Sequence, residues 1–265
     1  MNFGLIIIGD EILSGKRQDK HLARVIELLG ARGLSLAWAT YLGDEPVRIT
    51  AALKDAFASG DVVFSCGGIG ATPDDHTRQC AGAALGRPMR LHPEARELIM
   101  ARVRLMAAEK GWSDDPEHPD TLHRLNMGVF PEGAEIIPNP YNQIPGFSVG
   151  EVHFVPGFPV MAHPMIEALL DGRYAHLHGQ QRQEEHSVII YGAMEASLTP
   201  LMLDIEAQFP GIKVFSLPSV DHPQHGRHIE LGVKGQGPQV LAAYQALRVG
   251  LDRPEIRLGP EMVRR

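Results

Sequence analysis

The first third of the chain alternates short apolar runs with amphipathic stretches. Residues 3–8 form a continuous apolar run, which is typical of a parallel strand covered on both faces. Residues 21–32 and 46–58 place apolar side chains at helical spacing, and residues 34–42 and 62–66 are strand-like. This β-α-β-α-β order predicts a parallel sheet with right-handed crossovers and helices on both faces.

Further elements extend the pattern to about residue 170. They are helices at 74–85 and 93–110, a polar surface loop at 113–120, strands near 134–137 and 152–155, and a last helix after the turn Pro156-Gly157-Phe158-Pro159. Together they predict an α/β protein, a three-layer sandwich with a mostly parallel sheet, over residues 1–175.

A second, smaller domain is expected at residues 184–265. Residues 179–183 are polar and lack periodicity, which indicates a linker. The segments beyond it are typical of strand, helix, strand, strand and helix, at residues 187–191, 196–207, 212–217, 228–233 and 238–251. This order predicts a small α+β companion domain.

Composition narrows the class of protein. Apolar residues make up 44% of the 265 residues and charged residues 22%, which is ordinary globular usage. The apolar runs are far shorter than the roughly 20 residues of a membrane span, and the N-terminus lacks signal-peptide features. With only Cys66 and Cys80, no disulfide framework is expected, so we expect a cytoplasmic protein. The net charge of −7 disfavours nucleic acid as a partner, and no membrane partner is expected.

A glycine-rich loop at residues 67–77 directly follows a predicted strand and opens a predicted helix. Glycines let the backbone reach positive φ and approach a ligand closely, while free N–H groups and the helix dipole favour a phosphate. The candidate phosphate-binding residues of the loop are Gly67, Gly68, Gly70 and Thr72. The loop is neither a Walker A motif nor a dinucleotide fingerprint, because it lacks the Gly-Lys-Ser/Thr and Gly-x-Gly-x-x-Gly patterns.

The end of this loop carries two adjacent carboxylates, Asp74 and Asp75. Thr72 is expected to be the helix N-cap, with Pro73 at the first helical position and Asp75 at the third. One interpretation is that both carboxylates serve only the helix N-terminus. The other is that they hold Mg²⁺ or Mn²⁺ beside the ligand phosphates, because carboxylates next to a phosphate cradle need a counter-charge.

The loop after the first strand should face the same crevice, since ligands of parallel sheets lie beyond the carboxyl ends of the strands. Asp10 and Glu11 offer oxygen donors for a metal, although Asp10 alternatively caps a turn. Gly9, Ser14 and Gly15 offer close backbone approach and a hydroxyl for binding phosphate or nucleotide.

Nearby basic residues give two further hypotheses. Lys16, Arg17 and Lys20 could meet phosphate oxygens at the mouth of the crevice. For His76, two interpretations stay open: a general acid for a phosphate leaving group, or a partly exposed side chain without chemistry.

The two loops together resemble a known family. Residues 9–15 and 67–77 are similar to the MoaB/Mog molybdopterin-binding domain, and most closely to the branch at the N-terminus of CinA-type competence/damage-inducible proteins. The resemblance continues at Ile137-Pro138-Asn139-Pro140, Ile144-Pro145-Gly146-Phe147 and Val155-Pro156-Gly157-Phe158-Pro159, and covers about residues 3–170. It implies that Asn139, Pro156 and Gly157 belong to the binding site. Residues 192–198 resemble the family's companion domain, with Ala196 inserted.

What the resemblance implies is a domain that binds an adenine nucleotide or a phosphorylated pterin, together with a divalent metal (Mg, Mn or Co). CinA-type domains are associated with cleavage of the pyrophosphate bond of ADP-ribose. We therefore interpret the chain as a metal-dependent hydrolase of a nucleotide pyrophosphate such as ADP-ribose. Asp75 and Asp74 are the candidate catalytic residues, and Asp75, Asp10 and Glu11 the candidate metal ligands.

Two alternatives stay open. The first is a molybdopterin-binding protein that adenylylates molybdopterin or inserts metal during molybdenum cofactor biosynthesis, as Mog-type relatives do. The second is a non-catalytic ligand-binding module. A homo-oligomer is expected because Mog-type relatives commonly oligomerise. No deamidase activity is expected, because 265 residues leave no room for the family's C-terminal amidohydrolase domain.

The chain departs from the family at two places. Asp19-Lys20-His21 stands where many CinA relatives read Asn-Thr-Asn, so a polar ligand contact is expected to change. Tyr141-Asn142-Gln143 stands where relatives carry smaller residues, often glycine, which is expected to narrow the pocket. Both departures concern the identity of the substrate rather than the fold.

Overall fold

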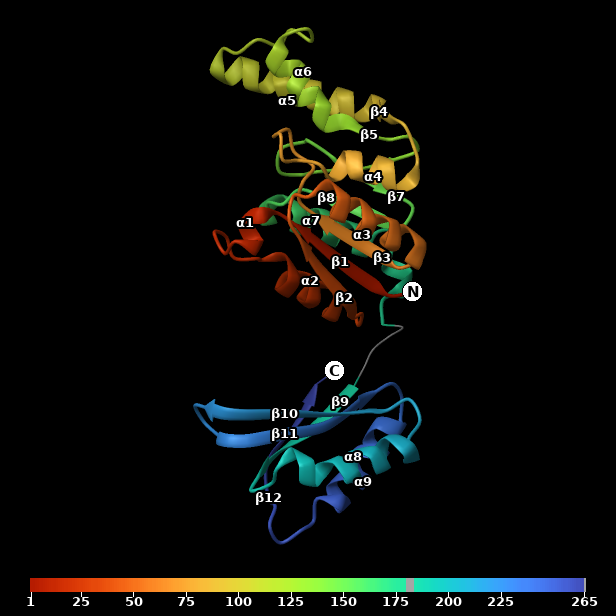
Figure 1. The fold of residues 1–265 in the computed structure, drawn as a ribbon, viewed down its shortest axis with the longest axis vertical. Coiled ribbons are helices and arrows are strands. Elements are labelled where there is room, and N and C mark those ends of the chain that lie inside the picture. Colours follow the sequence, from red (N-terminus) through yellow and green to blue (C-terminus); the bar gives the residue numbers. More distant parts are fainter. Residues whose placement is uncertain (180–183, 265) are drawn as a thin grey trace. The chain divides into compact units, whose positions relative to one another are not determined.

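The structure is a computed structural model that describes residues 1–179 and 184–264. The chain divides into two compact units, Met1–His178 and Gly179–Arg265 (Figure 1). Apart from Gly179, the linker predicted at 179–183 lies outside the described residues. No helix among the described residues is long and apolar enough to cross a membrane.

The first unit is built on a six-stranded sheet with the strand order β2-β1-β3-β8-β7-β6. Its strands are β1 (Phe3–Ile8), β2 (Leu36–Leu42), β3 (Val62–Cys66), β6 (Glu135–Ile137), β7 (Gly146–Val149) and β8 (Val152–Val155). β2, β1, β3 and β8 pair in parallel, whereas β7 and β6 add to β8 as an antiparallel edge. The predicted mixed α/β fold with a mostly parallel sheet is confirmed.

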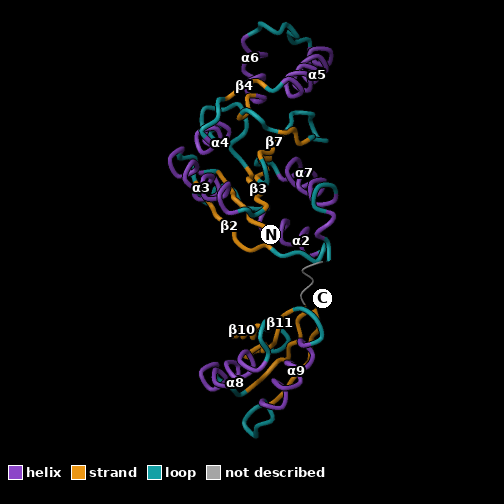
Figure 2. The backbone as a smooth tube through the Cα atoms, turned by 90° about the vertical axis from the view of Figure 1, so that its right-hand side faces the viewer, coloured by secondary structure: helices purple, strands orange, loops and turns teal. Residues whose placement is uncertain are grey.

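Helices cover this sheet on both faces. The helices of this unit are α1 (Asp10–Leu13), α2 (His21–Gly30), α3 (Pro46–Ser59), α4 (Thr77–Leu85), α5 (Pro93–Lys110), α6 (Pro119–Leu125) and α7 (Pro159–Asp171) with the short turns η1 (Asn126–Gly128) and η2 (Ala175–Leu177). In the tube view α2 and α7 lie near one side of the strands and α3 and α4 near the other (Figure 2).

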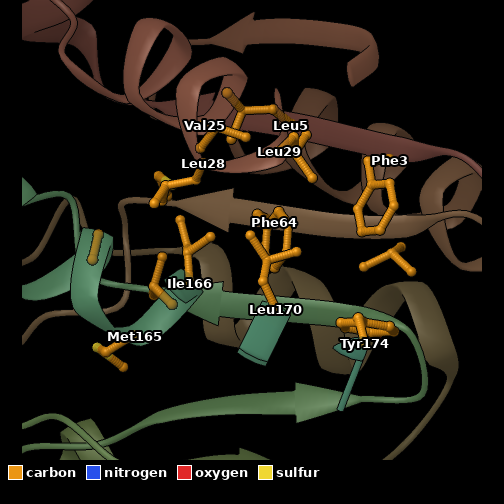
Figure 3. Close-up of a cluster of buried hydrophobic side chains, with 14 of the residues drawn as sticks. Phe3, Leu5, Val25, Leu28, Leu29, Phe64, Met165, Ile166, Leu170 and Tyr174 are labelled. Atoms are coloured by element: carbon orange, nitrogen blue, oxygen red, sulfur yellow. The ribbon is translucent and has the colours of Figure 1, made fainter. Parts of the chain in front are cut away.

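The apolar run of β1 explains this layering. Phe3, Leu5 and Ile7 point into a core formed with α2 and α7, and the alternate residues Ile6 and Ile8 point into a second core under α3 and α4. Figure 3 shows side chains of the first core meeting between β1, β3, α2 and α7. A strand buried on both faces is apolar at most positions, so the continuous run of residues 3–8 was the correct signal.

A helical excursion inserts between α4 and β6. The short strands β4 (Met89–Leu91) and β5 (Val129–Pro131) pair antiparallel and form its base. α5 and α6 lie beyond them, at one end of this unit (Figure 1). A small cluster of buried residues, Ile99, Met100, Val103 and Leu125, packs the two helices together. The predicted surface loop at 113–120 ends where α6 begins at Pro119.

The second unit is an antiparallel sheet with two helices. Its elements are β9 (Glu184–Tyr191), α8 (Glu195–Gln208), β10 (Lys213–His222), β11 (Gly226–Gly235), α9 (Gln239–Gly250) and β12 (Arg257–Arg264). The strand order is β10-β11-β9-β12, and both helices contribute to a single apolar core. The sequence analysis missed β12, because its residues are mostly exposed and show no apolar alternation.

A series of hydrogen bonds links side chains of β7 and β8 to Tyr174 and Glu151. Ser148 Oγ lies 2.7 Å from His153 Nδ1, His153 Nε2 lies 2.5 Å from the Tyr174 hydroxyl, and that hydroxyl donates to Glu151. Because the Tyr174 proton is given to Glu151, Nε2 of His153 donates to the tyrosine oxygen. In the neutral imidazole, Nδ1 then accepts from the Ser148 hydroxyl. Burial, with the charge of Arg173, lowers the pKa of His153 to about 3.

We expect the first unit to lose stability as the pH falls from 6.5 towards 3. Unfolded His153 has an ordinary pKa of 6.5 and binds a proton in this window, whereas folded His153 does not. The contribution of neutral His153 to the free energy of unfolding is therefore complete above pH 6.5 and is lost on acidification, by an amount on the order of 5 kcal/mol. Urea unfolding at several pH values measures it. Fluorescence reports on this unit, because both tryptophans, Trp38 and Trp112, lie in it.

His153→Gln is the matching control for this prediction. It removes the titrating group, so the dependence of unfolding free energy on pH should become clearly shallower, whatever the absolute stability of the variant. An unchanged slope between pH 6.5 and 3 would show that other groups govern acid sensitivity.

Candidate functional site

The main cavity of the first unit has a volume of about 610 Å³ and lies at the carboxyl ends of β1, β2, β3 and β8. Residues that follow each of these four strands line it, together with residues from the excursion, from the segment before β7 and from the start of α7. Of the predicted site residues, those that line the cavity are Gly9, Glu11, Gly67, Gly68, Gly70, Thr72, Asp74, Asp75, Asn139, Pro156 and Gly157.

Two glycines give the loop after β3 its shape. Gly67 has φ +108° and Gly68 φ +69°, conformations that side-chain-bearing residues rarely adopt. A Cβ atom on Gly67 would lie 2.2 Å from the carbonyl oxygen of Ile8, and one on Gly68 would lie 2.1 Å from Thr77 Oγ1. The loop is therefore pressed against β1 and the start of α4, which leaves its backbone facing the cavity.

The helix after the loop begins later than expected. α4 begins at Thr77 with His76 as N-cap, so the prediction of a helix from residue 74 capped by Thr72 is wrong. Instead, Asp75 Oδ2 accepts hydrogen bonds from the Thr72 amide at 2.8 Å and the Thr72 hydroxyl at 2.6 Å. This closed turn competes with a helical turn for the same backbone groups. It holds Asp74 and Asp75 at the cavity wall.

Because α4 begins late, its first turn does not lie at the main cavity. Among the described residues, no residue of α4 lines the main cavity. His76, Arg78 and Gln79 at the N-terminal end of α4 line a second cavity of about 370 Å³, which shares Ala71, Thr72 and Asp75 with the main cavity. In the main cavity the loop lines the wall without any residue of α4, so its backbone, rather than the first turn of the helix, is the candidate phosphate-binding segment.

Four carboxylates gather on the side of the cavity where β1 and β2 end. Asp10 and Asp44 form reciprocal hydrogen bonds. The Asp10 amide donates to Asp44 Oδ2 at 2.9 Å, and the Asp44 amide donates to Asp10 Oδ1 at 3.2 Å. Burial and the negative charges of Asp10, Glu11 and Asp74 raise the pKa of Asp44, against a hydrogen bond that lowers it. This mutual repulsion favours a bound cation.

The sequence analysis missed Asp44, although a signal for it existed. It follows β2, whose carboxyl end lies beside that of β1, so the rule that singled out Asp10 and Glu11 applies to it as well. Glu11 and Asp44 line the cavity, whereas Asp10 reaches it only through its hydrogen bonds with Asp44.

These carboxylates do not form a complete metal cage. No group of three histidine, cysteine, aspartate or glutamate side chains in the described part of the chain is placed to hold a metal ion. Mg²⁺ in nucleotide sites is typically held by one or two carboxylates, with the remaining oxygens from phosphates and water. The residues present fit an ion of that kind, one that enters with a phosphorylated ligand.

Ser14 and Gly15 lie outside the lining of the main cavity. Ser14 caps the C-terminal end of α1, where its amide donates to Asp10, and Gly15 continues the turn with φ +72°. The structure thus places both residues in a turn beside the cavity, and their roles in binding phosphate or nucleotide stay predictions. Arg17, two residues later, does line the cavity, and its guanidinium lies 5.8 Å from the centre of the Phe158 ring.

Asn139 shapes the wall rather than presenting its side chain to a ligand. It is 4% exposed, its amide nitrogen donates to Asn142 Oδ1 and to the Ile144 carbonyl, and its oxygen accepts from the Tyr141 amide. Gln143 within this turn has φ +67°, a left-handed conformation that favours glycine. Asn142 lines the cavity, whereas Tyr141 is exposed.

The other segment that departs from the family pattern, Asp19-Lys20-His21, makes contacts within the protein. Asp19 accepts from the amides of His21 and Leu22 and from the Tyr41 hydroxyl, which fastens the start of α2 to β2. His21 is buried, and its Nε2 lies 3.0 Å from the Gly157 carbonyl oxygen, within hydrogen-bonding distance. His21 therefore contacts the Gly157 loop, and none of Asp19, Lys20 and His21 lines the main cavity.

Comparison with known proteins places this site in a family. Residues 4–176 match the family described as "Probable molybdopterin binding domain". A CinA-like protein of Syntrophotalea carbinolica is 30% identical over 223 residues, which cover 79% of this chain and 51% of the relative. A protein of Pyrobaculum calidifontis is 31% identical over 85% of both chains.

One solved structure supports the same assignment. The crystal structure of the protein CinA with unknown function from Thermoplasma acidophilum aligns with a TM-score of 0.53 and 26% identity, over 64% of this chain and 98% of that one. The chain spans about half the length of the Syntrophotalea carbinolica relative. It belongs to the family of molybdopterin-binding domains that residues 4–176 match, and it is similar to the CinA-like proteins.

Proposed function

We propose that the protein is a metal-dependent hydrolase that cleaves a nucleotide pyrophosphate such as ADP-ribose in its main cavity. The observation that carries the proposal is that the backbone of the loop from Gly67 to Thr72 and the carboxylates Glu11, Asp44, Asp74 and Asp75 line one cavity. A backbone cradle binds phosphate oxygens, and the carboxylates supply the counter-charge that attracts a cation to them.

Each group has a role in this proposal. The loop backbone holds the pyrophosphate, and the Arg17 guanidinium at the wall neutralises part of its charge. Asp75 and Asp74 would hold the divalent ion, with Glu11 or with Asp10 through its partner Asp44. When bound, such an ion lowers the pKa of a coordinated water and polarises a phosphoryl oxygen. Thr72 keeps Asp75 in place through the two hydrogen bonds to Oδ2.

The cavity also has an apolar part suited to a planar ring. Met127, Ile144, Phe158 and Met161 line it, and Ile8 and Ile69, whose side chains belong to the core under α3 and α4, also border the cavity. An adenine ring fits such a surface, and so does a pterin. This wall, together with the family match, supports molybdopterin binding as the second candidate function, with adenylylation or metal insertion as its chemistry. A ligand sensor without chemistry uses the same surface.

Release of AMP separates these functions. The purified protein is incubated with ADP-ribose and related dinucleotides, with EDTA or with Mg²⁺, Mn²⁺ or Co²⁺, and the products are followed by chromatography. We expect AMP release that depends on the metal. If no product forms with any of the three metals, the hydrolase is rejected and pterin binding or ligand sensing takes its place; pterin fluorescence in the purified protein then favours the former.

A further inference from the structure

An exposed aromatic ring lies at the wall of the main cavity. Phe158 lines this cavity, yet 52% of its surface is accessible to solvent. Its backbone is fixed, because Phe158 is the N-cap residue of α7 and its carbonyl oxygen accepts from the amides of Met161 and Ala162, each at 2.9 Å. The ring is thus carried on a rigid turn while much of it stays uncovered. Apolar surface of this kind gains free energy when a ligand covers it.

A guanidinium lies over the same ring. Cζ of Arg17 is 5.8 Å from the centre of the Phe158 ring, near the outer limit of about 6 Å for a cation–π contact. The Arg17 amide donates to the Glu11 carbonyl at 2.9 Å, which fixes the backbone, and the residue itself is exposed. A planar ring between the two side chains needs about 7 Å, two contact layers of about 3.5 Å each. Arg17 therefore has to move outward by only about 1 Å to admit one.

The Phe158 ring also lies close to the candidate phosphate-binding backbone. A Cβ atom on Gly157, the preceding residue, would lie 3.4 Å from the Gly67 Cα, so the two loops pack closely at this point. Met127 and Ile144 add apolar lining to the same cavity. A ligand whose phosphate binds the Gly67 loop can therefore place a ring against Phe158 through a short linker such as a sugar.

We propose that Phe158 determines specificity in the main cavity. Its ring stacks against a bicyclic heteroaromatic ring, a purine or a pterin, of a phosphorylated ligand, and the Arg17 guanidinium covers the other face of that ring. Phenyl and guanidinium planes both stack favourably on heteroaromatic rings. This role rests on the proposed function only in that the ligand phosphate binds the loop from Gly67 to Thr72, and it does not require hydrolysis.

Isothermal titration calorimetry of the full chain with Mg²⁺ tests this role with three probes: AMP, neopterin monophosphate and ribose 5-phosphate. AMP has no pyrophosphate bond, so its binding is measured without turnover. Ribose 5-phosphate keeps the phosphate and lacks the heteroaromatic ring. The wild-type protein should bind AMP or neopterin monophosphate about tenfold or more tightly than ribose 5-phosphate. The tighter of these two ring-bearing probes identifies the ring.

Phe158→Leu removes the aromatic ring and keeps an apolar side chain at an exposed position, so the fold is expected to persist. Its affinity for the ring-bearing probe should fall about tenfold, because base–aromatic stacking is lost. Its affinity for ribose 5-phosphate should stay the same, a split that a change in loop shape would not give. Phe158→Trp should retain the preference for the ring. Phe215→Leu, at a half-buried position of β10 in the other unit, is the matched control and should bind all three probes like the wild type.

The proposal is overturned if Phe158→Leu binds AMP and neopterin monophosphate as tightly as Phe215→Leu does. It is also overturned if the wild-type protein binds neither ring-bearing probe more tightly than ribose 5-phosphate, or if Phe158→Leu weakens all three probes equally. Failure of the proposed hydrolase gives a different result. ADP-ribose then yields no AMP with any metal, while the preference for a ring-bearing probe and its dependence on Phe158 persist.

Discussion

Asp75→Asn is expected to abolish metal-dependent release of AMP from ADP-ribose while the fold stays intact. The asparagine oxygen can still accept the two hydrogen bonds that Thr72 gives to Asp75 Oδ2, so the turn is retained. The negative charge that would hold the divalent ion is lost. We expect kcat/KM to fall by about 100-fold or more, since a metal that activates water contributes several kcal/mol.

The control for this variant is Asp114→Asn, which removes one carboxylate from an exposed position outside both cavities. Its turnover should equal that of the wild-type protein. Urea unfolding of both variants tests the fold. The free energy of unfolding of each is expected to lie within about 1 kcal/mol of the wild-type value. If Asp75→Asn turns over ADP-ribose at the wild-type rate, Asp75 is not a metal ligand in the reaction and the assignment fails.

Gly67→Ala is expected to reduce the stability of the first unit by more than about 3 kcal/mol and to abolish ligand binding. The new Cβ would lie 2.2 Å from the Ile8 carbonyl oxygen, a backbone atom that cannot move without shifting β1. The residue would also be held at φ +108°, which is strained for alanine. Relief of the contact moves the loop away from Val155, whose carbonyl accepts from the Gly67 amide.

Gly15→Ala separates the clash from the backbone strain. Gly15 also has positive φ, +72°, but a Cβ there meets no atom within 4 Å. It should cost only the left-handed penalty of about 1 kcal/mol, with ligand binding retained because Gly15 lies outside the cavity lining. Urea unfolding followed by tryptophan fluorescence measures both. Equal losses in the two variants would show that close packing against β1 is unimportant.

Local periodicity was sufficient for most of the first unit. The uninterrupted apolar run of β1 predicted a strand covered on both faces, because alternate side chains of a strand must enter opposite cores. α5 begins and ends where the helical pattern of residues 93–110 placed it, and β8 spans the predicted residues 152–155. These elements depend on repeating patterns that a single segment carries in full.

The antiparallel additions were less visible. β7 has four residues, all buried, and β12 is largely exposed, so neither shows a period of two. Each strand forms because a neighbouring strand offers hydrogen-bonding groups at its edge, β8 for β7 and β9 for β12. That partner is chosen by the three-dimensional arrangement, which the pattern of one short segment does not contain.

The sequence by itself determined the βα order, the glycine-rich loop and the sheet edge at which it lies, because residue periodicity and chain chirality act locally. Tertiary structure decided how that loop is used. Asp75 binds Thr72 and the Thr77 amide binds the Gly68 carbonyl, so the helix starts late, at Thr77. The first turn of α4 consequently lies outside the lining of the main cavity, and Arg78 binds the Gly70 and Asn126 carbonyls, because these contacts depend on where the fold places the loop after β3 and η1.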